Sequence, residues 1–206
     1  MKKNYFLGII LFLLSIYNFK AQSYYYYKGQ QQPLVLDKRG FDIYVNNNFQ
    51  IGSASSNLES FSLNTITSNE KAASVEFITT PTSTQYFSKL NELKANTNLI
   101  SVQPRFITAQ SDTLRLSNYL FVKLKTSSSF ATLQNIASTK NFTIVGPNQY
   151  MPLWYKVKCD KNTLGNPLEI ANYIFETGSF AAAQPDFLEL LKEDKELLKN
   201  FRIKRL

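Results

Sequence analysis

Asn118-Tyr-Leu-Phe-Val-Lys-Leu-Lys125 decides the fold of this chain, because aliphatic residues alternate along it as they do in a half-buried β-strand. Every second side chain of a strand points to the same face of its sheet. The aliphatic set is expected to face a core and consists of Leu120, Val122 and Leu124. The opposite face then carries two aromatic rings and two cations, which are Tyr119, Phe121, Lys123 and Lys125.

Five further elements are predicted after this strand. They are a helix over 128–139, strands over 142–145 and 154–159, a helix over 167–177 and a strand over 180–187. Ser128 is expected to cap the first helix at its N-terminus. Asn166 and Pro167 have the residue types of an N-cap and a first helical position, and Gly178 is expected to end the second helix.

The order strand-helix-strand-strand-helix-strand predicts a ferredoxin-like domain over residues 113–188, with both helices on one face of a four-stranded sheet. The other face is then open, and the first and third strands lie at its centre. On the third strand, Trp154, Lys156 and Lys158 point outward by the same alternation. The expected partner-binding face consists of Tyr119, Phe121, Lys123, Trp154 and Lys156. The alternative is that the N-terminal segment folds over this face and buries its aromatic rings.

Residues 22–110 predict a β-rich N-terminal domain with one helix, which makes the fold class α+β. Runs of strand-forming residues lie at 24–27, 33–36, 41–45, 74–78, 99–102 and 106–108. The spacing of Tyr86, Phe87, Leu90 and Leu93 predicts an amphipathic helix within 82–98. A polar turn near 110–113 is the expected domain boundary.

Residues 1–21 have the layout of a secretory signal peptide, with Lys2 and Lys3 before an apolar run and Ala21 at the expected cleavage point. The run is shorter than the roughly 20 residues that span a bilayer, so no stable membrane anchor is expected after cleavage. A permanent anchor is the alternative. The mature chain is expected to be secreted or periplasmic. Loss of the leader lowers the formal charge from +8 to +5, which is too modest to predict a polyanionic partner by itself.

Several residue types that enzyme chemistry requires are missing from the sequence. The chain contains no His, which excludes imidazole as a base and therefore the Ser-His-Asp triad. Its single cysteine, Cys159, allows no internal disulfide, and without His a zinc site is not expected. No phosphate-binding loop and no GxGxxG occur, so no cofactor is expected. We therefore predict a non-catalytic protein without a bound metal.

A nucleic acid is one candidate partner for the open face, because the RNA recognition module has this topology and stacks bases on aromatic side chains. The third strand, Trp154-Tyr-Lys-Val-Lys-Cys-Asp160, lacks the K/R-G-F/Y-G/A-F-V-x-F/Y pattern of that module. We therefore expect no nucleic-acid partner.

Three stretches resemble the N-terminal prosegment of secreted bacterial subtilisin-like serine peptidases. They are Tyr24-Tyr-Tyr-Tyr-Lys-Gly29, Tyr150-Met-Pro-Leu-Trp-Tyr155 and Asn172-Tyr-Ile-Phe-Glu-Thr-Gly-Ser-Phe-Ala-Ala-Ala-Gln-Pro-Asp-Phe187. The likeness covers nearly all of the mature chain to about Leu188, and its most specific part ends in an "(A/V)-x-P-D" step. The resemblance implies a ferredoxin-like domain that packs its open face on the peptidase, assists its folding and leaves a C-terminal tail in the active-site cleft.

On this resemblance, the expected cleft-binding tail comprises Asp186, Phe187, Leu188, Glu189, Leu190 and Leu191. An extended segment of this kind can add as a strand to the edge of a cleft. The alternative is a C-terminal helix, which the Lys, Glu and Leu content of the charged tail over 189–206 also predicts.

The resembled peptidases continue into a catalytic domain that carries Asp, His and Ser. Residues 192–206 do not resemble the start of that domain, so no catalytic residue is carried over to this chain. The leading expectation is a stand-alone inhibitor or folding assistant of a subtilisin-like serine peptidase. The alternatives are the truncated remnant of a secreted serine endopeptidase and a surface or adhesion protein that binds an unrelated ligand.

Overall fold

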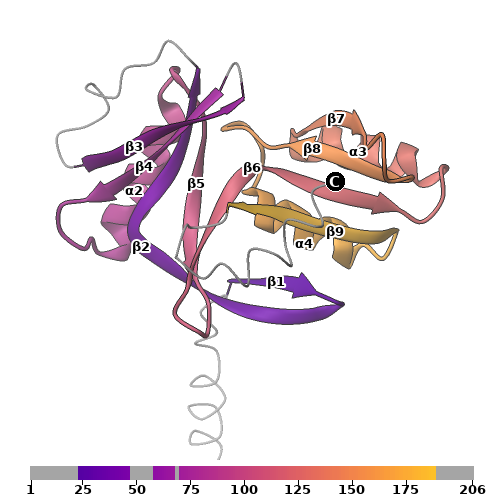
Figure 1. Ribbon diagram of the computed structural model, residues 1–206, viewed down its shortest axis with the longest axis horizontal. Coiled ribbons are helices and arrows are strands. Elements are labelled where there is room, and N and C mark those ends of the chain that lie inside the picture. The colour runs from indigo at the N-terminus through magenta and orange to yellow at the C-terminus, as the bar shows by residue number, and fades with distance from the viewer. Residues whose placement is uncertain (1–22, 47–57, 68–69, 189–206) are drawn as a thin grey trace, which may run out of the picture.

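The computed structural model describes residues 23–46, 58–67 and 70–188 (Figure 1). The predicted signal peptide with Ala21 and the predicted tail over 189–206 lie outside the described residues. Within that part of the chain, strands β2 to β9 form one antiparallel sheet, and β1 pairs with the first part of β2. The described ranges also contain three helices, α2, α3 and α4, whose bounds are given below. The expected α+β class is therefore confirmed.

The N-terminal half contributes four strands of this sheet in the order β3-β4-β2-β5. Its elements are β1 (Ser23–Tyr27), β2 (Gln30–Asn46), β3 (Leu58–Thr67), β4 (Glu70–Phe77), α2 (Ser83–Ala95) and β5 (Leu99–Ile107). The sequence predicted two separate strands where β2 is one long strand. A register shift between Asp37 and Phe41 lets both pieces pair with β5 without ending the strand.

Gly40 lies at this irregularity, where β2 approaches β4 closely. A Cβ atom added at Gly40 would lie 2.2 Å from the carbonyl oxygen of Val75. No side chain fits in that space, so the close pairing of β2 with β4 requires glycine at this position.

The C-terminal half contributes the strand order β9-β6-β8-β7. Its elements are β6 (Thr113–Leu124), α3 (Ser129–Lys140), β7 (Thr143–Pro147), β8 (Trp154–Lys158), α4 (Pro167–Glu176) and β9 (Phe180–Leu188). The predicted boundary near 110–113 is a tight turn in which the Thr108 N–H donates to the carbonyl of Asp112. Strands β5 and β6 pair directly on either side of that turn, so the sheet is continuous across both halves.

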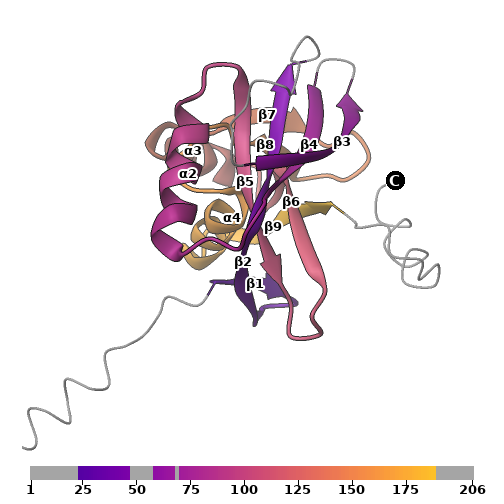
Figure 2. The same ribbon diagram turned by 90° about the vertical axis from the view of Figure 1, so that its left-hand side faces the viewer.

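All three helices lie on the same side of the sheet (Figure 2). Below α3 and α4, the core includes Leu120, Val122 and Leu124, so the expected direction of these side chains is confirmed. A second core packs α2 on the N-terminal half and includes Phe41, Ile43 and Tyr86. A third cluster joins the halves and consists of Leu34, Phe106, Leu116 and Leu168.

The helix boundaries follow local capping chemistry. Asn166 accepts hydrogen bonds from the N–H groups of Leu168 and Glu169, which confirms it as the N-cap of α4, and Gly178 follows that helix with φ of 67°. Ser128 occupies the N-cap position of α3 but makes no side-chain capping bond. Its hydroxyl lies 2.8 Å from that of Thr126 instead, so the prediction that Ser128 caps this helix was wrong.

Strand β1 connects the N-terminus of the described chain to the C-terminal half. The hydroxyl groups of Tyr24 and Tyr26 both donate to the carboxylate of Glu176 on α4. The side-chain amide of Asn172 donates to the carbonyl of Tyr24 at 2.6 Å. These contacts span about 150 residues of sequence and hold the first strand against the last helix.

Candidate functional site

The residues expected to form a partner-binding face lie side by side on β6 and β8. The paired positions of these antiparallel strands are Tyr119 with Lys158, Phe121 with Lys156, and Lys123 with Trp154. We call these six residues the aromatic-basic face. Because they alternate with buried aliphatic residues, all six point away from α3 and α4. The structure therefore places the five predicted residues on neighbouring strands, together with Lys158, whose outward direction was also predicted from sequence.

Cations and rings on this face are arranged in contact with one another. The ammonium group of Lys156 lies 3.7 Å from the ring centre of Tyr119, and that of Lys123 lies 6.0 Å from the ring centre of Trp154. Lys158 approaches Tyr119 from the neighbouring position at 5.9 Å. Such contacts place flexible lysine side chains over rigid aromatic rings.

The aromatic-basic face is half-buried rather than fully covered, since all six side chains have intermediate exposure. Strand β1 packs on α4, on the helix side of the sheet. There the ring of Tyr26 lies 4.4 Å from that of Phe175. The described first strand therefore covers the helix layer and not this face.

Of the predicted cleft-binding tail, the first three residues belong to strand β9. Phe187 pairs with Leu116 and Leu188 with Arg115 on β6, and the ring of Phe187 packs 5.4 Å from that of Tyr25. Asp186, Phe187 and Leu188 therefore extend the sheet, as the predicted strand over 180–187 implies for the first two, and their binding to a peptidase cleft stays a prediction. Glu189, Leu190 and Leu191 lie outside the described residues.

A buried charge network on the N-terminal half was not anticipated from sequence. Asp42 is fully buried and accepts from Arg115 Nε at 2.9 Å, while Arg105 Nε lies 3.4 Å from the same carboxylate. Arg105 also binds Glu76 at 2.7 Å and the carbonyl of Phe41 at 2.9 Å. Burial alone would lower the pKa of Arg115, but its hydrogen bond to Asp42 raises it above the ordinary value. These hydrogen bonds and ion pairs join strands β2, β4, β5 and β6.

The sequence did contain a signal for this network, which is the alternation along β2. Asp42 stands between Phe41 and Ile43, and the latter two face the core below α2. A carboxylate on the other face of an interior strand requires a cationic partner when it is buried. Arg105 and Arg115 occupy paired positions on β5 and β6, which places both guanidinium groups near that carboxylate.

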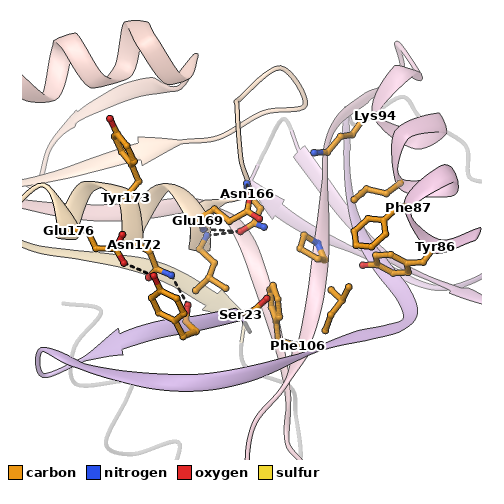
Figure 3. A pocket seen from close by; sticks show the side chains of 15 residues that line it. Ser23, Tyr86, Phe87, Lys94, Phe106, Asn166, Glu169, Asn172, Tyr173 and Glu176 are labelled. Carbon is orange, nitrogen blue, oxygen red and sulfur yellow. Dashed lines mark hydrogen bonds between the residues drawn. The ribbon is translucent and has the colours of Figure 1, made fainter. Parts of the chain in front are cut away.

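A groove lies on the helix side, between α2 and α4 (Figure 3). Its volume is about 520 Å³, and strand β1 forms one of its walls. The apolar lining is contributed by both halves and consists of Leu36, Phe87, Leu90, Pro104, Phe106 and Leu168. The sequence placed Phe87 on the inner face of its helix, but its side chain is 51% exposed. This exposed ring is the feature of α2 that sequence analysis misjudged.

The remaining reactive groups offer little chemistry. Cys159 is fully buried, and burial followed by the nearby Asp160 carboxylate raises the pKa of its thiol to about 12. Among the residues that the structure describes, no group of three or more His, Cys, Asp or Glu side chains could hold a metal ion.

No helix within the described ranges is long and apolar enough to cross a membrane. No family model matches the chain, and no curated protein matches it in sequence.

Proposed function

We propose that the chain is a non-catalytic, exported binding protein that docks its aromatic-basic face on a subtilisin-like serine peptidase, as an inhibitor or folding assistant. The observation that carries this proposal is the cross-strand pairing of rings and cations on β6 and β8. Aromatic residues such as Tyr, Trp and Phe are enriched in protein interfaces and anchor them, and charged residues such as lysine belong to the polar rim around such anchors.

The arrangement of the C-terminal half supports a ferredoxin-like assignment for this domain. Strand order β9-β6-β8-β7 places the first and third strands at the centre, with α3 and α4 on one side. The aromatic-basic face then occupies the middle of the side without helices. The resemblance of Asn172 to Phe187 to a peptidase prosegment supplies the partner class for that surface.

The direct test is titration of a secreted subtilisin-like peptidase from the same organism with purified residues 22–206. Stoichiometric inhibition, followed by slow cleavage of the protein, is the expected result. Folding assistance is tested separately by refolding the denatured peptidase with and without the protein. A well-folded sample that neither inhibits nor accelerates refolding would contradict the proposal and would favour a gene remnant or a surface protein with another ligand.

The contribution of the face is tested with Phe121→Ala and Trp154→Ala. Each substitution should weaken inhibition by about 1 to 4 kcal/mol if these rings are interface anchors. Phe87→Ala is the matched control, because Phe87 is also an exposed ring but lies on the helix side of the sheet. Equal losses for all three variants would show that the effect is not specific to the aromatic-basic face.

The contribution of the tail is tested by ending the chain after Leu188, which keeps β9 intact. Inhibition should be lost while the domain stays folded, if Glu189, Leu190 and Leu191 enter the cleft. Full inhibition by the shortened chain would disprove the tail mechanism without contradicting docking through the face.

A further inference from the structure

The loop that joins β7 to β8 presents exposed apolar side chains at the end of the sheet. Tyr150 is 74% exposed, and Leu153 is 37% exposed. The loop lies beside the end of β6, where the N–H of Leu124 donates to the carbonyl of Leu153 at 2.9 Å (Figure 1). Trp154 of the aromatic-basic face follows the loop directly in the chain. The exposed apolar side chains are therefore continuous with that face.

Hydrogen bonds within the loop fix its conformation. The side-chain oxygen of Asn148 accepts from the N–H groups of Tyr150 at 2.9 Å and Met151 at 3.0 Å. The N–H of Asn148 donates to the carbonyl of Trp154 at 2.7 Å, and the N–H of Trp154 donates to the carbonyl of Met151 at 3.2 Å. A surface that is ordered before binding loses less conformational entropy when a partner binds. This loop therefore presents its apolar side chains at a low entropic cost.

Leu153 has a backbone conformation that does not favour leucine. Its φ is 65°, in the left-handed region that glycine and asparagine adopt with less strain. The other non-glycine residues with positive φ in the described ranges are Lys28, Ser111 and Asn141, so Leu153 is the apolar member of this group. Because its side chain is also exposed, burial in the core does not account for leucine at this position. Strain of this kind is common at binding sites.

We propose that the β7–β8 loop is a second anchor of the docking surface, and that Tyr150 and Leu153 enter an apolar depression on the peptidase beside the area that the aromatic-basic face covers. This inference rests on the proposed function, because it concerns the same partner. The loop fits a protein better than a lipid surface. A depression of fixed shape rewards a loop of fixed shape, whereas a bilayer surface imposes no such shape.

The test is inhibition of the secreted subtilisin-like peptidase by residues 22–206 that carry Tyr150→Ala or Leu153→Asn. Each substitution should raise the inhibition constant about tenfold, as expected for loss of an interface anchor. Leu164→Asn is the matched control, because Leu164 is 60% exposed and follows the other end of β8. The control should leave the inhibition constant unchanged.

The outcomes separate this inference from the proposed function. Unchanged inhibition by either loop variant, or equal weakening by the control, would overturn the inference and leave docking through the aromatic-basic face intact. Absence of inhibition by the wild type would contradict the proposed function, and the inference with it.

The melting temperature of Leu153→Asn separates a binding role from a structural role and requires no peptidase. Asparagine adopts a positive φ with less strain than leucine, so the melting temperature should not fall. A larger fall for Leu153→Asn than for Leu164→Asn would assign Leu153 to the fold and overturn the inference.

Sedimentation with vesicles of phosphatidylglycerol and phosphatidylcholine tests a lipid surface as the partner instead. The wild-type protein should remain in the supernatant. Binding to the vesicles that is lost in Leu153→Asn would make the loop a lipid anchor, and it would overturn the assignment of this loop to a protein partner.

Discussion

The two halves of the sheet differ in how they place charged side chains on the face that the helices do not cover. Both halves bury one face under helices. On the other face, the N-terminal half buries charged groups around Asp42, whereas the C-terminal half leaves the rings and cations around Phe121 partly exposed. In the first case the charges form ion pairs with one another, and in the second the ammonium groups of Lys123 and Lys156 lie over aromatic rings. A charged residue in a strand can therefore serve the fold or a partner, depending on what faces it.

The largest effect is expected from breaking the buried network with Asp42→Ala. The substitution leaves Arg105 and Arg115 without their shared carboxylate in a buried site. Loss of one partner from a buried pair costs about 3 to 5 kcal/mol, and urea unfolding should show this decrease in the free energy of unfolding. The control is Glu92→Ala, which removes the exposed partner of Lys89 and should cost less than about 1 kcal/mol. Similar losses for both variants would contradict a structural role for the network.

Neighbouring residues on β6 test the comparison within one strand. Leu120→Ala removes a fully buried side chain from the core below α4 and should cost about 2 to 5 kcal/mol of stability. Phe121→Ala removes a half-buried ring from the aromatic-basic face and should cost about 0.2 to 1 kcal/mol, as expected for a cross-strand pair. Urea unfolding of both variants gives the comparison. A larger loss for Phe121→Ala would mean that this ring belongs to the core.

The sequence predicted the C-terminal half well, because each of its elements is specified locally. Alternation along 118–125 identified the inward and outward sides of β6, and the Asn166-Pro167 pair identified the start of α4. The helix around Tyr86 was also found, but the exposure of Phe87 was not, because periodicity does not reveal how far α2 stands from α4.

The features that sequence analysis missed depend on contacts between distant segments. The Asp42 network joins β2 with β5 and β6. The hydrogen bond from the Tyr24 hydroxyl to Glu176 joins residues that lie 152 positions apart in the sequence. The predicted strand over 180–187 already included Phe187, but the sequence does not show which strand it pairs with. Only the register with Leu116 places it in the sheet.

Gly40→Ala is expected to have an intermediate effect on the N-terminal half. The added methyl group would collide with the backbone carbonyl of Val75, which cannot rotate away as a side chain can. Overpacking of this kind costs about 1 to 3 kcal/mol. Gly29→Ala is the control, because a Cβ atom there has no neighbour within 4 Å, although its φ of 78° adds backbone strain. A loss for Gly40→Ala no larger than that of the control would mean that the collision with Val75 costs no more than the backbone strain at Gly29.

The smallest effect is expected for the hydrogen bond from Tyr24 to Glu176, which holds β1 against the C-terminal half. The hydrogen bond to Glu176 raises the pKa of Tyr24 from 10.0 to about 12. A phenol whose pKa is higher in the folded state contributes stability that is fully present below pH 10 and is lost as the pH rises toward 12. Tyr24→Phe removes this contribution, so the variant should be slightly less stable than the wild type at pH 8 and nearly equal to it at pH 12. Urea midpoints across that range give the comparison. A difference that stays constant with pH would mean that the ring of Tyr24, rather than its hydroxyl, holds β1 on α4.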